Sequence, residues 1–304
     1  MTLTTTQKNL EVIILAAGRG TRMRSSRPKV LHPLAGKYLI QHVIDTAQAL
    51  NPTQIHVVVG HGADAVEQAL AGQNLNFHQQ TEQLGTGHAV ACALPGCASN
   101  SAVLVLFGDV PLVAASTLKT LIAGSQDNPS MLAARLDDPQ GYGRVLRSEQ
   151  GHFLAVVEQA DANETQALIN EVNTGVLAAP VEQLSALLNL VGNDNAQGEY
   201  YLPDALGLAQ QQGIAVAVAV TDDPLEMYGI NDRLQLQTLE RALQCRRADT
   251  LMSAGVAVAD RQRIDIRGEL ACGTDVEIDI NVVFEGQVSL GDGVRVGAHC
   301  VLKD

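Results

Sequence analysis

The stretch VIILAAGRGTRMRSSRPKVLHPLAGKYLIQHVI, from Val12 to Ile44, decides the fold that we expect for this chain. It begins as an apolar run and passes directly into a segment rich in glycine and arginine. It holds six Lys or Arg residues and no Asp or Glu, and five of the six fall between Arg19 and Lys29. The whole chain is acidic, with a net charge of −13. A basic loop directly behind an apolar run in such a chain indicates a local anion-binding site.

Composition excludes several classes of protein. The strong negative charge argues against non-specific binding to nucleic acid and to an anionic membrane surface. No apolar run approaches the roughly 18 residues of a membrane span, and the polar N-terminus lacks the apolar region of a signal peptide. The five cysteines form no CxxC pair, and their odd number predicts a reducing, cytoplasmic location. The length of 304 residues suits one large domain or two smaller ones.

From Val12 to about Val220, apolar runs alternate with helical patterns. The runs VIILAAG, IHVVVGHG, AVLVLFGD, SMLAARLD, FLAVVEQAD, VNTGVLAA and IAVAVAVTD are typical of strands, and several are continuously apolar. Between them, YLIQHVIDTAQALN, ADAVEQALAG and VEQLSALLNLVG are typical of amphipathic helices. This order predicts an α/β domain with a Rossmann-like, mostly parallel sheet, whose ligands lie at the carboxyl ends of the strands.

The C-terminal part of the chain has a different pattern. A helix with regularly spaced leucines is expected over residues 232–254. Beyond it, apolar positions recur every six residues, at Val276, Val282, Val288, Val294 and Cys300. Hexapeptide periodicity predicts a parallel β-helix, and the alternative is two hairpins with coincidental spacing. The chain ends at CVLKD without a capping segment, so we expect a truncated β-helix.

The Gly-rich basic loop admits several interpretations. A Walker A loop is excluded because no Gly-Lys pair stands at the required spacing from Gly18 or Gly20. A dinucleotide fingerprint is disfavoured because Met23 occupies its third glycine position. The ordinary alternative is a strand-to-helix turn whose arginines are solvated and bind no ligand. We favour a loop whose backbone N–H groups and cationic side chains surround a nucleoside triphosphate.

The loop also carries a family resemblance. LAAGRGTRM followed by RPKVLHPLAGK resembles the signature of sugar-phosphate nucleotide pyrophosphorylases. Further matches follow in order: EQLGTGHA, GDVPL, GYGR, VEQADA, VNTG, NAQGEYYLPD and GIND. Together with the hexapeptide segment, they resemble the bacterial bifunctional N-acetylglucosamine-1-phosphate uridyltransferase/glucosamine-1-phosphate acetyltransferase family over about residues 10–304.

The resemblance implies a domain organisation and an assembly. It implies a flexible tail over residues 1–10, a nucleotidyltransferase domain over 11–231 and a connecting helix over 232–254. The first coils of a truncated left-handed β-helix would occupy 255–304. Members of the family are homotrimers through this β-helix, and we expect truncation to weaken the trimer. The family's acetyltransferase residues lie beyond this chain, so we expect no acetyl transfer.

The implied substrates are UTP and N-acetyl-α-D-glucosamine 1-phosphate, and the products are UDP-N-acetylglucosamine and pyrophosphate. No nucleophile–base pair stands out in the sequence, which suits a reaction between phosphates driven by positioning and charge. By resemblance, Arg22 contacts the triphosphate and Lys29 contacts the phosphates at the reacting centre, while Asp109 acts with them. The surplus cations Arg19, Arg24 and Arg27 have no implied role.

The resemblance also implies a set of nucleotide-binding residues. A glutamine amide both donates and accepts, as a pyrimidine edge requires, but alone Gln80 and Gln83 are typical of a polar loop that opens a helix. With the resemblance, the nucleotide-binding residues become Leu15, Ala16, Ala17, Gly18, Lys29, Gln80, Gln83, Gly85, Thr86, Phe107, Gly108 and Asp109.

A magnesium ion is the implied cofactor. Asp109 ends a strand pattern, where a turn or helix cap is the ordinary alternative, and Asn231 alone is typical of a helix N-cap. The resemblance assigns both to Mg²⁺, which prefers oxygen ligands and fills its shell with phosphate and water.

The implied sugar-phosphate site draws on Gly143, Glu158, Asn173, Tyr201 and Asn231. Here the sequence departs from the family, which commonly has Thr where this chain has Pro203. The change removes a hydroxyl and an N–H, so we expect altered contacts to the sugar.

Rival functions remain at this point. They are a pyrophosphorylase for another sugar phosphate or nucleotide, a non-catalytic nucleotide-sugar sensor, and a trimeric β-helix acyltransferase. The series from GYGR to EYY favours N-acetylglucosamine 1-phosphate over other sugars, and the presence of both Lys29 and Asp109 disfavours the sensor.

Overall fold

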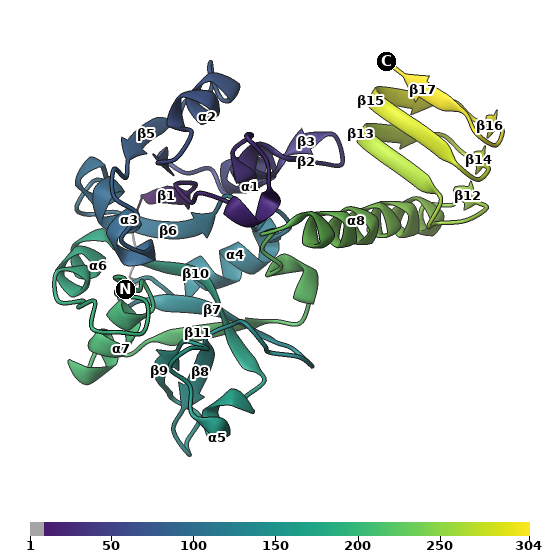
Figure 1. The fold of residues 1–304 in the computed structure, drawn as a ribbon. Coiled ribbons are helices and arrows are strands. Elements are labelled where there is room, and N and C mark those ends of the chain that lie inside the picture. Colours follow the sequence, from purple (N-terminus) through teal and green to yellow (C-terminus); the bar gives the residue numbers. More distant parts are fainter. Residues whose placement is uncertain (1–8) are drawn as a thin grey trace, which may run out of the picture. The chain divides into compact units, whose positions relative to one another are not determined.

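The computed structural model describes residues 9–304, which divide into two compact units (Figure 1). The first contains the described residues up to Arg19, then Ser26–Val30 and Ile40–Tyr228. The second contains Gly20–Ser25, Leu31–Leu39 and Gly229–Asp304. Each has its own hydrophobic core. The predicted flexible tail falls outside the described residues except for its last two positions.

The first unit is built on a nine-stranded sheet with the order β11-β7-β10-β6-β1-β4-β5, to which β8 adds beside β10 and β9 beside β8. Strands β1, β4, β5 and β6 run parallel, as do β7 and β11, whereas β10 runs antiparallel to β6 and β7. The prediction of a mostly parallel α/β sheet is confirmed. The strands are β1 (Leu10–Leu15), β4 (Gln54–Val59), β5 (Asn76–Gln79), β6 (Ala102–Phe107), β7 (Ser130–Arg135), β8 (Arg144–Arg147), β9 (Phe153–Val157), β10 (Glu171–Pro180) and β11 (Ala217–Thr221).

Helices cover both faces of this sheet. Helices α3 (Thr86–Ala93), α6 (Val181–Leu188) and α7 (Asp204–Gln211) share one apolar core with the sheet face that carries Ile13 and Val105. Helices α1 (Leu39–Gln48) and α4 (Ala115–Ala123) meet the opposite face around Leu106. The short helices α2 (Ala63–Ala69) and α5 (Glu164–Ala167) lie in connections. Burial on both faces explains why the central strands are continuously apolar.

The carboxyl ends of β1, β4 and β6 meet at one edge of the sheet. The backbone N–H of Ala16 donates to Val58 O at 2.8 Å, and that of Gly108 donates to Leu15 O at 2.9 Å. The loop after β1 therefore starts beside the turn after β6. A short 3-10 helix, η2 (Lys29–Leu31), follows in the chain, and its first two residues, Lys29 and Val30, belong to the first unit.

The second unit combines a long helix with stacked coils. Helix α8 (Arg233–Ser253) lies where the leucine spacing predicted a helix. Its N-cap residue is Asp232, whose side chain accepts a hydrogen bond from Gln235 N. Two three-stranded parallel sheets follow: β12 (Ala257–Val258), β14 (Glu277–Ile278) and β16 (Arg295–Val296), and then β13 (Ile264–Cys272), β15 (Val282–Leu290) and β17 (Val301–Lys303). The unit also holds the hairpin β2 (Pro33–Leu34) and β3 (Lys37–Tyr38) and the 3-10 helix η1 (Thr21–Met23).

The register of these coils agrees with a hexapeptide repeat. Ile264 pairs with Val282, a spacing of 282 − 264 = 18 residues, which is three hexapeptides per coil. Of the in-phase positions, Val276 and Val282 are fully buried, whereas Cys300 is exposed. The start of a parallel β-helix is therefore confirmed, and coincidental hairpins are excluded because every strand pair is parallel.

Among residues 9–304, no helix combines the length and the apolar character needed to cross a bilayer.

Candidate nucleotide site

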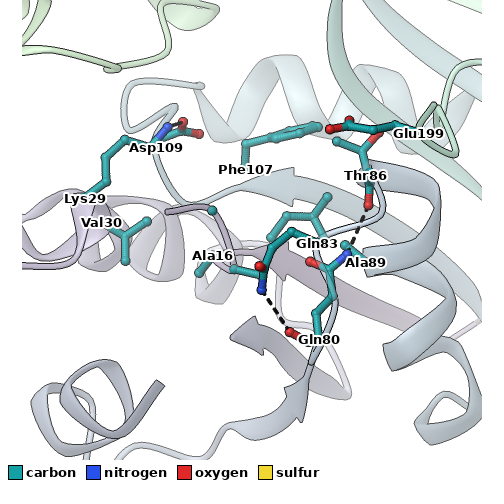
Figure 2. A pocket seen from close by; sticks show the side chains of 14 residues that line it. Ala16, Lys29, Val30, Gln80, Gln83, Thr86, Ala89, Phe107, Asp109 and Glu199 are labelled. Atoms are coloured by element: carbon teal, nitrogen blue, oxygen red, sulfur yellow. Dashed lines mark hydrogen bonds and ion pairs between the residues drawn. The ribbon is translucent and has the colours of Figure 1, made fainter. Parts of the chain in front are cut away.

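A cleft of about 230 Å³ opens at the carboxyl end of the parallel strands of the first unit (Figure 2). Its walls come from the end of β1, the start of η2, the loop before α3 and the end of β6. The lining residues are Leu15, Ala16, Ala17, Gly18, Lys29, Val30, Gln80, Gln83, Gly85, Thr86, Ala89, Phe107, Asp109 and Glu199. All of the predicted nucleotide-binding residues except Gly108 therefore lie around a single cavity.

The backbone that follows β1 forms one wall. It is fixed by Val58, which accepts from Ala16, and by the close approach of Gly60, where a Cβ would lie 2.9 Å from the Ala17 carbonyl oxygen. The space around Gly18 is open, because a Cβ placed there would meet nothing within 4 Å. A ligand can thus approach the backbone at Gly18 directly.

A buried glutamine organises the facing loop. Gln80 is 3% exposed, and its backbone N–H donates to Val59 O at 2.8 Å, which extends the end of β4. Its side-chain amide donates to Gly85 O at 3.1 Å (Figure 2). The same amide nitrogen lies 3.1 Å from His88 Nδ1. Gln83 donates in turn to Gln80 O at 3.2 Å. The amides of this loop are therefore held before any ligand arrives, which suits recognition of a planar base edge.

The turn that opens α3 is clamped by a distant segment. Tyr200 N donates to Leu84 O and Tyr200 O accepts from Gly87 N, both at 2.8 Å. Leu202 N donates to the Thr86 hydroxyl at 3.0 Å. Gly85, with φ of 108°, lies inside this clamp, and a Cβ there would stand 2.6 Å from Tyr200 O. Only glycine fits this position.

Substitution of Gly85 by Ala is expected to raise the KM for the nucleotide about tenfold and to lower the melting temperature. The new Cβ combines an unfavourable φ, costing about 1–3 kcal/mol, with a backbone clash that displaces the loop holding Gln80. Steady-state kinetics and thermal unfolding measure both effects. Gly72→Ala is the matched control, since Gly72 has φ of 84° but open space around it. Equal changes in nucleotide KM for the two variants would contradict the role of the clamp.

An ion pair stands at the mouth of the cleft. Lys29 Nζ binds the Asp109 carboxylate, and both side chains are largely buried (Figure 2). Asp109 follows β6 directly and Lys29 begins η2, so two segments 80 residues apart in sequence deliver opposite charges to one point. Within residues 9–304, no His or Cys lines this cleft. A carboxylate with a neighbouring cation and no soft ligand fits a hard divalent ion such as Mg²⁺, together with phosphate oxygens.

A second group of predicted residues gathers around Glu158. A Cβ at Gly143 would lie 3.1 Å from Glu158 Oε1, and Gly143 O accepts from Asn173 N at 2.8 Å. Asn173 Oδ1 accepts from Gly175 N at 2.9 Å. A Cβ at Gly175 would stand 2.6 Å from the Phe107 ring, which lines the cleft. Three of the predicted sugar-phosphate residues are therefore brought together beside the nucleotide cleft.

Tyr201 faces acidic side chains from the same region. Its hydroxyl is buried and has no hydrogen-bond partner among the described residues. Burial raises its pKa, and the charges of Asp161, Glu158, Glu199 and Asp204 raise it further. Burial, followed by the charges of Asp204 and Asp161, likewise raises the pKa of Glu158. An unpartnered hydroxyl beside surplus carboxylates fits a neutral ligand that can both donate and accept hydrogen bonds.

Other predicted residues lie elsewhere. Arg22 is on η1 and Asn231 directly precedes α8, and both belong to the second unit, so their roles at the cleft stay predictions. Gly108 forms part of the β6 turn without lining the cavity. Pro203 stands at the N-terminal cap of α7 with φ of −62°, a conformation that suits the start of a helix.

The sequence analysis missed several residues of this region. Val30, Ala89 and Glu199 line the cleft, and the first two carry no polar signal. Arg144 is 2% exposed and its guanidinium donates to Tyr142 O, to Ala167 O and to Gln159 Oε1. These hydrogen bonds join segments that precede and follow Glu158 in the sequence. Arg144 is the last residue of the GYGR match, which marked this region without assigning a role to the arginine.

Comparison with known proteins identifies the family of this chain. The model of the MobA-like NTP transferase domain matches residues 12–258. The bifunctional protein GlmU of Marinobacter nauticus is 51% identical over 296 residues, and those of Pseudomonas putida and Burkholderia mallei are 50% and 51% identical. The alignments cover 97% of this chain and 65% of those relatives, so the chain spans about two thirds of their length.

A solved nucleotidyl transferase from Methanothermobacter matches in fold. It superposes with a TM-score of 0.54 at 20% identity, over 81% of this chain and 99% of that structure. At this level of identity, the likeness concerns the fold.

Proposed function

Because the chain belongs to the family of MobA-like NTP transferase domains, which its residues 12–258 match, we propose that it is a uridylyltransferase. It joins UTP to N-acetyl-α-D-glucosamine 1-phosphate and releases UDP-N-acetylglucosamine and pyrophosphate. The observation that carries this proposal is the cleft in which the Lys29–Asp109 pair faces the fixed amides of Gln80 and Gln83. The name of the GlmU relatives supports it.

The proposed chemistry is an in-line displacement. An oxygen of the sugar phosphate forms a bond to the α-phosphorus of UTP, and the bond from that phosphorus to the bridging oxygen of pyrophosphate breaks. The attacking phosphate is already anionic, so no general base is needed. Lys29, at the start of η2, offsets charge on the phosphates, and the open backbone at Gly18 lets them approach closely.

We assign the metal to Asp109. A divalent ion held there would supply positive charge that offsets the negative charge developing on the leaving pyrophosphate. The base would lie in the cleft beside the loop that the Gln80–Gly85 hydrogen bond fixes, next to Gln83 and Thr86. The sugar would lie among Gly143, Glu158, Asn173 and Tyr201, where the unpartnered hydroxyl of Tyr201 finds a partner. We infer a cytoplasmic location from the five cysteines, all of which are free thiols.

The test is pyrophosphate release by the chain with Mg²⁺ and a matrix of the four nucleoside triphosphates against several sugar 1-phosphates. We expect release to be fastest with UTP and N-acetylglucosamine 1-phosphate. Faster release with another pair would replace the proposed specificity, and no release with any pair would overturn the proposed activity.

Substitution of Glu158 by Gln is expected to weaken sugar-phosphate binding and to stabilise the fold. The pKa of Glu158 is raised by burial and by Asp204 and Asp161, so its ionised form is disfavoured in the folded state. At a pH above the raised pKa, the folded chain bears this cost; as the pH falls through that pKa, the folded state takes up the proton before the unfolded state does, and the cost disappears.

Thermal unfolding should therefore show a higher melting temperature for Glu158→Gln at about pH 8, where an ordinary carboxyl is ionised, and a smaller difference as the pH is lowered. The KM for the sugar phosphate should rise, because the amide of Gln places a donor where the carboxylate only accepts. Glu149→Gln, at an exposed position, is the control and should change neither quantity. A melting temperature lowered by Glu158→Gln at the higher pH would contradict the assigned burial cost.

A further inference from the structure

A buried cluster of ligand-type side chains lies away from the cleft. Glu11 is the second residue of β1, His56 lies in β4, and Cys97 follows η3 (Leu94–Gly96), before β6 begins. These positions are near the amino ends of the strands, whereas the cleft is at their carboxyl ends. One ligand atom from each side chain lies within 4.8 Å of the other two. The proposed uridylyl transfer uses none of the three.

The residues around the cluster already hold two of these side chains in place. Glu11 Oε1 accepts from Ala98 N at 2.9 Å and from the Ser101 hydroxyl at 3.0 Å, which leaves Oε2 facing His56 Nε2 at 2.9 Å. The other ring nitrogen of His56, Nδ1, lies 2.8 Å from His78 Nε2. In metalloproteins, such outer hydrogen bonds orient the carboxylate and the imidazole that bind the ion.

The backbone at Gly96 packs closely against the imidazole rings of His78 and His56. A Cβ at Gly96 would lie 2.7 Å from the His78 ring and 3.4 Å from that of His56, although its φ does not lie in the left-handed region. Glycine is therefore required there by close approach rather than by backbone conformation. On the outer side, Pro95, Gly96 and residues 98–100 are exposed and Cys97 is half-buried, which gives an ion a short path inward.

We propose that Glu11, His56 and Cys97 form a binding site for a zinc-like divalent ion. A thiolate, an imidazole and a carboxylate are the ligand types that select Zn²⁺ over the hard Mg²⁺ of the cleft. Tetrahedral coordination with bonds of about 2.0–2.3 Å requires ligand atoms about 3.3–3.8 Å apart. Glu11 Oε2 and His56 Nε2, which lie 2.9 Å apart, must therefore separate slightly, and the Cys97 sulfur adjusts to the same spacing within a cluster whose ligand atoms all lie within 4.8 Å of one another. The exposed segment that carries Cys97 allows this movement.

Charge and tautomer are consistent with such a site. Without the ion, burial and the Glu11 charge raise the pKa of Cys97 to about 12, so the thiol stays protonated at neutral pH. Burial alone would raise the pKa of Glu11, but hydrogen bonds from Ala98, His56, Ser101 and Cys97 outweigh it and lower the pKa, so the carboxylate is ionised. Binding then displaces the thiol proton, and the carboxylate and thiolate together neutralise the divalent ion.

The His56–His78 pair supplies the required tautomer. Burial, and then the His56 charge, lower the pKa of His78, which favours its neutral form. A neutral His78 can accept from His56 Nδ1–H, which leaves the lone pair of His56 Nε2 directed at the ion. The two rings, with centroids 5.0 Å apart, can therefore reverse their hydrogen bond when the proton on Nε2 is replaced by metal.

The experiment titrates the purified chain, freed of metal by a chelator, with Co²⁺ and then with Zn²⁺. We expect one equivalent of Co²⁺ to give a thiolate charge-transfer band in the near ultraviolet, and Zn²⁺ to displace it while excess Mg²⁺ does not. Zn²⁺ should also raise the melting temperature, because it binds only the folded arrangement. Cys97→Ser should abolish the band and the rise, and Glu11→Gln should weaken both.

Cys300→Ser is the matched control, because Cys300 is the exposed thiol and is the one most open to adventitious metal. It should leave the band and the stabilisation intact. Nucleotidyl transfer by Cys97→Ser with Mg²⁺ should equal that of the unchanged chain, which separates this site from the proposed activity. The absence of a band, or a band that survives Cys97→Ser, would overturn the proposal.

Discussion

Substitution of Lys29 by Ala is expected to lower kcat by about 10²–10³-fold, the usual effect of removing one preorganised charge contact to a transition state. Lys29 is a cation that lines the cleft, where its ammonium binds Asp109. In the proposed reaction, negative charge accumulates on the phosphates, and this ammonium is the group placed to offset it. Because the effect is on the transition state, kcat should fall more than the KM for UTP rises.

The fold should survive this change. Lys29 begins a short 3-10 helix, and its loss leaves Asp109 with partial access to water. Lys119→Ala removes the same charge from an exposed position on α4, outside the cleft, and should leave kcat unchanged. Lys29→Arg should recover part of the activity, since it restores the charge with a different geometry. A Lys29→Ala enzyme with kcat within a few-fold of the unchanged chain would remove Lys29 from the proposed mechanism.

Much of the fold could be predicted because burial leaves a direct trace in the sequence. Strands β1, β4, β6 and β7 are buried on both faces and are therefore largely apolar. The β-helix could also be predicted, since each coil of 18 residues holds three hexapeptides and the apolar positions therefore recur every six residues. Strands β5 and β8 were missed for the same reason. β5 is an edge strand with the sequence NFHQ and no buried position, and β8 is flanked by arginines.

The cleft was predicted through motifs, and its supporting residues were not. The loops that carry Lys29, Gln80, Gly85 and Asp109 have distinctive sequences that resemble a family signature. The clamp of Tyr200 on the turn before α3 joins segments more than a hundred residues apart, and nothing in single-sequence spacing reports such a contact.

The cluster of Glu11, His56 and Cys97 could not be predicted from the sequence for the same reason. A metal motif that can be recognised from sequence spacing, such as a CxxC pair, lies within one segment of the chain. Here the three side chains come from two strands and a loop, and become neighbours only because β1 pairs with β4 and β6. A hydrophilic residue inside an otherwise apolar strand was the available signal: Glu11 and His56 both interrupt apolar runs.

Substitution of Asp109 by Asn is expected to lower kcat by a similar factor, roughly 10²–10³-fold, but through the metal. A bound divalent ion contributes several kcal/mol to stabilising the transition-state charge, and each 1.4 kcal/mol corresponds to a factor of ten. Asn keeps the shape of the side chain and loses its charge, so the affinity for Mg²⁺ should fall. The diagnostic measurement is the Mg²⁺ concentration that gives half-maximal rate, which should rise strongly in Asp109→Asn.

The Mg²⁺ midpoint must be measured because loss of the ion pair with Lys29 would also lower kcat in Asp109→Asn. If the carboxylate only positions the Lys29 ammonium, Asp109→Asn will lower kcat without moving the Mg²⁺ midpoint, and excess Mg²⁺ will not restore the rate. If it binds the metal, high Mg²⁺ will recover part of the rate, whereas Lys29→Ala will not respond in this way. Asp64→Asn, at an exposed carboxylate on α2, should change neither quantity. A lowered kcat with an unchanged Mg²⁺ midpoint would make Asp109 a positioning residue for Lys29, and the metal ligands would then have to be sought among other oxygens of the cleft.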